Sequence, residues 1–189
     1  MANKEKHQFF PVEDVVQSAF RIGTLAVNRL HSDYAGLNVL NTVLGGYFGS
    51  RLMRNLREDK GYTYGVSSVL LSFADAGYFF AASEVKGEHT SKAIEQVYLE
   101  MNKLREEIVP DEELERVKNY LFGRYLRSID GVYAQSELLL ELFRFGQDFS
   151  FYSNYLMKMG ETTVLDLNVL ARKYLNTDEM FEAVAGVKQ

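Results

Sequence analysis

Three β-rich segments lie in the first half of this chain and a fourth lies at its end, and a long helical region separates the third from the fourth. Strands are predicted at residues 18–28, 62–72, 77–85 and 180–187, and the middle two are typical of an antiparallel hairpin. Hydrophobic side chains recur at helical spacing over residues 33–44, 94–104, 111–125, 132–145, 150–158 and 163–174. This order predicts an α+β fold, in which helices cover one face of an antiparallel β-sheet.

The length of 189 residues is typical of one domain, and no Gly/Ser-rich linker divides the chain. We therefore expect a single domain over residues 1–189. The first ten residues contain no apolar stretch typical of a signal peptide, and they resemble the start of an excised piece. We accordingly expect the domain to be a fragment of a longer chain, and nothing in the sequence indicates its compartment.

The composition excludes several classes of protein. Hydrophobic residues make up 47% and charged residues 25% of the chain, which excludes a disordered protein. The 21 basic and 26 acidic side chains give a net charge of −5, whereas a nucleic-acid-binding protein needs a basic surface. Since no apolar run approaches the roughly 18 residues of a membrane span, we expect neither a nucleic acid nor a membrane as partner.

The sequence offers no recognisable metal site. The chain has no cysteine, which excludes thiolate ligands, and its three histidines are His7, His31 and His89. The motif His-Glu-x-x-His fails because no histidine is followed by glutamate. The inverted motif His-x-x-Glu-His would need a histidine four residues before His89, and Val85 occupies that position. We therefore predict that this chain binds no zinc of its own.

The most distinctive segment runs from residue 44 to residue 66, LGGYFGSRLMRNLREDKGYTYGV. A helix is predicted to end at Gly45-Gly46, and a short helix to run from Ser50 to Arg57. The chain then turns and enters a predicted strand that carries Tyr64. A guanidinium and a phenol brought together in this way suit an anionic or carbonyl-rich ligand.

Each of these residues also has a purely structural interpretation. The two glycines would serve as a helix C-cap if the chain turns there in the left-handed conformation. Arg57 near a helix C-terminus would complement the helix dipole, a contribution of about 0.3–1 kcal/mol. Tyr64 in a strand would be a half-buried packing residue, because aromatic side chains favour pleated surfaces. The spacing of the residues leaves both interpretations open.

The segment LNVLNTVLGGYFGSRLMRNLREDKGYTYGV resembles the C-terminal-type domain of the pitrilysin (insulinase) family of zinc metallopeptidases, the inverzincins. The similarity extends upstream to QSAFRIG and downstream through DEELERVKNYLFG to the closing strand. The resemblance implies two homologous α+β halves that face each other around a chamber. It also implies the half-unit fold of the mitochondrial processing peptidases and of LuxS.

In that family one half holds zinc, and the other half contributes an arginine and a tyrosine to the shared site. The resemblance places these catalytic and substrate-binding roles on Arg57 and Tyr64. It adds Gly45, Gly46 and Ser50 to the substrate-binding set as the adjoining glycine-rich turn. The cofactor it implies is zinc in a partner half, and the partners it implies are that zinc-bearing homologous domain or subunit and an unfolded peptide.

We therefore expect the zinc-free half of a metalloendopeptidase, inactive by itself, that completes the active site and helps to bind extended peptides. The alternative is a non-catalytic structural or interaction module of the same fold. A third possibility, an independent enzyme, finds no His/Asp/Glu constellation in the sequence to support it.

Overall fold

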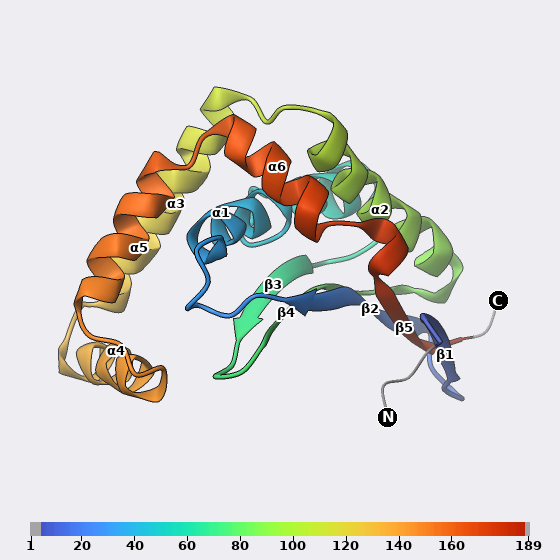
Figure 1. The fold of residues 1–189 in the computed structure, drawn as a ribbon. Coiled ribbons are helices and arrows are strands. Elements are labelled where there is room, and N and C mark those ends of the chain that lie inside the picture. Colours follow the sequence, from blue (N-terminus) through green and yellow to red (C-terminus); the bar gives the residue numbers. More distant parts are fainter. Residues whose placement is uncertain (1–4, 188–189) are drawn as a thin grey trace.

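The computed structural model describes residues 5–187, and these contain a five-stranded sheet with the order β1-β5-β2-β4-β3 (Figure 1). The strands are β1 (His7–Pro11), β2 (Gln17–Ala26), β3 (Val66–Ser72), β4 (Gly77–Lys86) and β5 (Phe181–Gly186). Neighbouring strands are antiparallel, except that β1 and β5 are parallel. Strands from the two ends of the chain thus lie side by side at one edge of the sheet.

The helices lie over one face of this sheet, and the other face is open (Figure 1). They are α1 (Tyr34–Leu44), α2 (Thr90–Glu106), α3 (Asp111–Ser128), α4 (Val132–Arg144), α5 (Ser150–Glu161) and α6 (Val164–Tyr174). The shorter helical elements are η1 (Met53–Asp59), η2 (Gly87–His89) and η3 (Thr177–Glu179). The predicted α+β fold with one covered face is therefore confirmed. Within residues 5–187, no helix combines the length and the apolar character needed to cross a membrane.

Three local features differ from the sequence-based expectation. No strand is predicted at β1, because HQFFP lacks the alternation of a half-buried strand and ends in proline. The strand predicted from residue 62 begins only at Val66, so Tyr64 lies in a loop. The helix that carries Arg57 is a π-helix, in which Lys60 N–H donates to the carbonyl of Asn55, five residues earlier.

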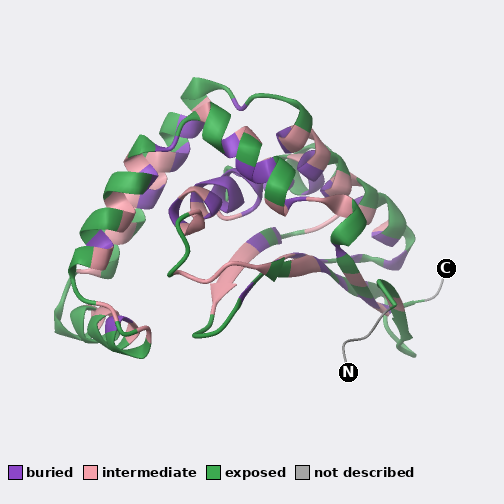
Figure 2. Ribbon diagram, in the orientation of Figure 1, coloured by how far each residue is buried: buried purple, intermediate pink, exposed green. Residues whose placement is uncertain are grey.

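Alternation along the strands decides which side chains form the core. In β2, Ser18, Phe20 and Ile22 are at most 1% exposed, whereas the residues between them are exposed. The buried set faces α1, α2 and α6, and Figure 2 shows this buried layer between the sheet and the helices. Each large apolar side chain buried here contributes about 1.5–3 kcal/mol. The burial of one strand face therefore fixes which residues remain on the open face.

The end of α1 packs closely against β3. Ser68 N–H donates to the carbonyl of Gly45 at 3.0 Å, and a Cβ on Gly45 would lie 2.5 Å from the Ser68 nitrogen. Gly45 has φ −155°, and Gly46 is not among the positive-φ residues of the described chain. Gly45 is thus the C-cap residue of α1, as that interpretation expected, but neither glycine adopts the left-handed conformation that it assumed. Gly45 is needed because there is no space for a side chain.

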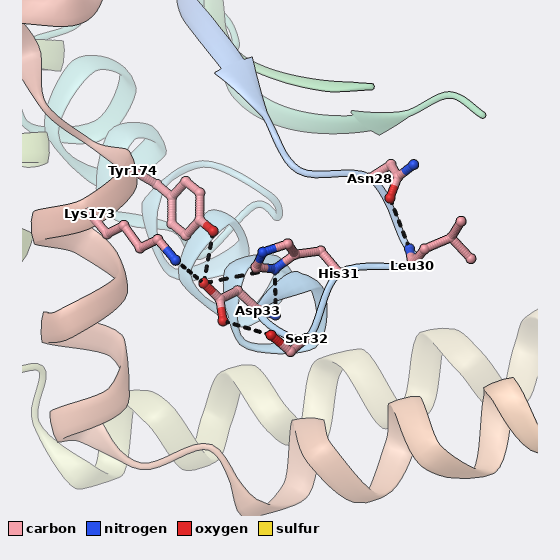
Figure 3. Close-up of polar contacts among 7 residues, drawn as sticks. All are labelled: Asn28, Leu30, His31, Ser32, Asp33, Lys173 and Tyr174. Carbon is pink, nitrogen blue, oxygen red and sulfur yellow. Dashed lines mark hydrogen bonds and ion pairs between the residues drawn. The ribbon is translucent and has the colours of Figure 1, made fainter. Parts of the chain in front are cut away.

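A polar cluster ties the start of α1 to the end of α6 (Figure 3). Lys173 Nζ and the Tyr174 hydroxyl donate to Asp33 Oδ2 at 2.7 and 2.8 Å. The Asp33 N–H donates to His31 Nδ1 at 3.0 Å. The hydrogen bond from Lys173, supported by that from Tyr174, lowers the pKa of Asp33 below its ordinary value of 3.8 even though partial burial opposes this. The cluster therefore holds two helices that are distant in the sequence against each other.

Candidate functional site

Tyr64 lies on a short loop that joins η1 to β3. Its side chain is 91% exposed, so it is not the half-buried strand residue that its local sequence also allowed. The loop begins at Gly61, which has φ +64°, a conformation that glycine adopts without strain. Tyr62 N–H donates to the carbonyl of Leu56 at 2.9 Å and so fixes the start of the loop to the end of η1. The loop thus presents the phenol of Tyr64 to solvent.

The residues on both sides of the Tyr64 loop are anchored. The Tyr62 ring stacks on His89 with centroids 4.8 Å apart and an interplanar angle of 26°. The Thr63 hydroxyl donates to the carbonyl of Glu84 at 2.7 Å and accepts a hydrogen bond from Ser83 Oγ at 3.0 Å. These contacts tie the loop to η2 and to β4. Tyr64 is consequently an exposed side chain on a restrained backbone.

Arg57 occupies the solvent-facing side of η1. Leu56 and Met53 on the same element are buried, at 0% and 7% exposure, so the helix is fixed to the core by its other face. The Arg57 guanidinium carbon lies 4.8 Å from the centre of the Phe48 ring. Stacking on a ring face orients the guanidinium and leaves its N–H groups free to donate in its plane.

Tyr64 forms part of a cleft of about 660 Å³ on the open face of the sheet. Small side chains from three strands line it: Ala19, Ala82, Ala183 and Ala185. Arg57 is not among the lining residues, and no hydrogen bond joins it to Tyr64 within the described chain. The structure therefore places Tyr64 at the cleft and Arg57 outside its lining.

Two charged residues of the cleft were not selected from the sequence. Arg21 of β2 and Glu84 of β4 both line it, and the Arg21 guanidinium carbon lies 5.9 Å from the centre of the Phe80 ring. The signal that reveals them is strand alternation, because each is an exposed residue between buried neighbours. Only the register that pairs β2 with β4 brings them to the same cleft.

The glycine-rich turn lies apart from this cleft. Gly45 is buried against β3, and a Cβ on Gly46 would lie 2.7 Å from the Thr42 Cα. Ser50 is 1% exposed, and its hydroxyl has no hydrogen-bond partner among residues 5–187. These positions shape the turn between α1 and η1, and none of them lines the cleft.

The described residues contain no group of three or more His, Cys, Asp or Glu side chains that could hold a metal ion. Each histidine has another neighbour: His7 lies 3.7 Å from Glu182, His31 pairs with Asp33 and His89 stacks on Tyr62. His89 is partly buried in this stack. The donor set of residues 5–187 therefore does not fit zinc.

Comparison with known families decides what kind of domain this is. Residues 1–121 match the family profile described as the Peptidase M16 inactive domain. The chain belongs to this family. The resemblance to a zinc-free domain of zinc metallopeptidases is thereby confirmed.

The relatives of this M16 inactive domain include longer proteins. "Uncharacterized zinc protease YmxG" of Bacillus subtilis is 30% identical over 118 residues, which cover 62% of this chain and 29% of the relative. "Probable inactive metalloprotease YmfF" of the same organism is 25% identical over 130 residues, which cover 68% of this chain and 30% of the relative. The M16 inactive domain thus spans about a third of the length of these relatives.

A solved structure supports the assignment. The crystal structure of the peptidase M16 inactive domain from Pseudomonas fluorescens superposes with a TM-score of 0.85 at 26% sequence identity. The superposition covers 97% of this chain and 43% of that chain. The match covers nearly the whole chain, so the half-unit fold implied by the sequence resemblance is confirmed.

Proposed function

We propose that this M16 inactive domain completes the active site of a zinc metalloendopeptidase. In this proposal it faces a zinc-bearing homologous half and helps to bind an extended, unfolded peptide. The observation that carries the proposal is the state of Tyr64, which is 91% exposed on an anchored loop beside a cleft. A large exposed aromatic side chain on a restrained backbone contributes little to packing, and it is positioned for contact with another molecule.

In the proposed mechanism the Tyr64 hydroxyl acts as a hydrogen-bond donor. Zinc in the other half, when bound, supplies an activated water for attack on a peptide carbonyl. Negative charge then develops on the carbonyl oxygen, and the Tyr64 O–H donates to that oxygen from the opposite side. The anchors at Tyr62 and Thr63 hold the donor in place before the reaction, so little reorganisation is needed as the charge forms.

Arg57 has a binding role in this proposal. Its stack on Phe48 leaves the planar guanidinium edge available for substrate carbonyl groups. Gly45, Gly46 and Ser50 act as the framework of the turn that places η1, since Gly45 and Ser50 are buried. The alanine side chains that line the cleft leave room for a peptide beside Tyr64.

A second candidate is a non-catalytic interaction module of the same fold. It is favoured by the relative named "Probable inactive metalloprotease YmfF", which matches 68% of this chain. In that case the exposed face of the domain would bind a partner without contributing to hydrolysis. The two candidates differ in what the Tyr64 hydroxyl does.

The test uses this domain assembled with its zinc-bearing half, with unfolded casein as the substrate. Tyr64→Phe removes only the hydroxyl, and we expect kcat to fall by about 10²–10³ with little change in KM. Arg57→Lys replaces a planar fork by a point charge, so we expect mainly a higher KM. Tyr125→Phe in α3 is the matched control, because its hydroxyl lies outside the cleft.

Thermal unfolding of each variant separates a site effect from a folding effect. The midpoint should not change in Tyr64→Phe, because that ring is exposed. Near-wild-type kcat in Tyr64→Phe would exclude Tyr64 from the mechanism and favour the interaction module.

A further inference from the structure

Helix α4 exposes an unusual amount of apolar surface. Val132, Tyr133, Leu139, Leu140 and Phe143 are between 53% and 90% exposed. Leu142 is the only residue of this helix that is buried, and Figure 2 shows α4 as an almost entirely exposed helix. We call these five residues the α4 face. Contiguous apolar surface of this kind on a soluble domain marks an interaction site.

The spacing of the α4 face follows a helical stripe. Residues 132, 139 and 143, and residues 133 and 140, recur at intervals of four or seven, so they lie along one side of the helix. The side that packs against the domain carries Leu138, Glu141 and Leu142, which are intermediate or buried. The helix therefore has apolar side chains on two sides, one that faces its own domain and one that faces solvent.

A defined set of contacts holds α4 against the domain. Arg29, from the connection between β2 and α1, donates to Glu141 Oε2 at 3.1 Å, and its side chain is 11% exposed. The Arg29 guanidinium carbon lies 4.9 and 4.6 Å from the ring centres of Phe145 and Phe151. The Tyr152 hydroxyl donates to the carbonyl of Leu138 at 3.2 Å. Because these contacts fix the helix, the exposed face has a definite orientation.

The position of α4 leaves this face accessible to a second folded domain. In Figure 1 the helix lies at the far end of α3 and α5, away from the layer that covers the sheet. Gly131 and Gly146, at φ +92° and φ +61°, turn the chain at its two ends. The two turns direct α4 away from the paths of α3 and α5.

We propose that the α4 face is the surface on which the homologous zinc-bearing half of the enzyme docks. The proposal rests on the proposed function, because it requires that such a half exists. The length of the relatives supports this occupant: the domain covers 29% and 30% of the two Bacillus proteins and 43% of the Pseudomonas chain. The remainder of each of those chains is long enough to form a second domain of at least similar size.

The small and balanced charge of the α4 surface also favours a folded partner that presents an apolar surface. Glu137 and Arg144 are the only exposed charged residues on this helix, and they have opposite signs. Such a surface does not attract a strongly charged peptide or an anionic membrane, which would require one sign of charge to dominate. An apolar face bordered by a few polar groups is typical of an interface between folded domains.

The experiment titrates this 189-residue chain with the purified zinc-motif-bearing half from the same genome and measures association by calorimetry. Leu139→Gln/Phe143→Gln removes two apolar side chains and keeps good helix formers at both positions. We expect the double variant to bind at least about 30-fold more weakly. The matched control is Leu165→Gln/Val169→Gln, since both residues are 65% exposed on α6. The control should bind as the wild type does.

The outcomes separate this proposal from the proposed function. Weaker binding by the α4 variant, with unchanged circular dichroism and with kcat recovered at saturating partner, supports docking at α4. Unchanged binding by the α4 variant overturns the docking surface, even if Tyr64→Phe still lowers kcat. A dimer of the chain alone that the α4 variant dissociates would also overturn it, because the occupant would then be a second copy.

Discussion

The close approach of Gly45 to β3 makes a sharp prediction about Gly45→Ala. A Cβ at this position would lie 2.5 Å from the Ser68 nitrogen, 2.7 Å from Ser68 Oγ and 3.0 Å from Leu52 Cδ1. The nearest atom belongs to the backbone and cannot rotate away. Ser68 N–H is also the donor to the Gly45 carbonyl, so moving β3 apart would break that hydrogen bond.

The magnitude follows from these two effects. Overpacking a buried position costs about 1–3 kcal/mol, and a weakened backbone hydrogen bond adds about 0.5–1.5 kcal/mol. We expect Gly45→Ala to lower the free energy of unfolding by about 2–4 kcal/mol, measured by urea denaturation. For a domain of this size the thermal midpoint would fall by roughly 4–16 °C.

Substitutions at two other glycines separate the effect of missing space on stability from the effect of backbone conformation. A Cβ on Gly65 would meet no atom within 4 Å, and its φ is not positive, so Gly65→Ala should change stability by less than about 0.5 kcal/mol. Gly61 also has open space but has φ +64°, so Gly61→Ala should cost about 1 kcal/mol through strain alone. If Gly45→Ala were as stable as Gly65→Ala, the close-packing argument would be refuted.

Two further predictions concern the polar contacts that hold the helices. Arg29→Ala should lower the free energy of unfolding by about 2 kcal/mol, because it removes two ring contacts and the ion pair with Glu141. Arg144→Ala, which removes a 71% exposed partner of the same carboxylate, should change it by less than about 0.5 kcal/mol in the same urea titration. Asp33→Asn should cost about 1 kcal/mol at about pH 7, because the lowered pKa of Asp33 means that its ionised form stabilises the fold above the ordinary value of 3.8. That contribution is lost as the pH falls through 3.8 and below, so a difference between wild type and variant that is equally large at about pH 3 would contradict it.

The sequence by itself determines the parts of this protein that depend on local periodicity. The helical stripes of α2, α3 and α6 predict those helices to within a few residues, and the hairpin of β3 and β4 follows from two β-rich runs around a short turn. The ordered segment from residue 44 to residue 66 indicates the family and selects Arg57 and Tyr64 as the candidate site. These features can be predicted from the sequence because they depend only on residues that are close together along the chain.

The tertiary structure decides the features that depend on distant residues. β1 becomes a strand because β5, at the other end of the chain, pairs with it, and its own sequence carries no strand pattern. Tyr64 is exposed because Thr63 and Tyr62 are anchored to β4 and η2, which keeps the loop out of the sheet. The cleft beside it exists only because β2, β4 and β5 bring four alanines together. A periodic pattern records which side of an element is apolar, but only the packed fold determines what that side contacts, and the outward face of α4 is apolar yet remains exposed.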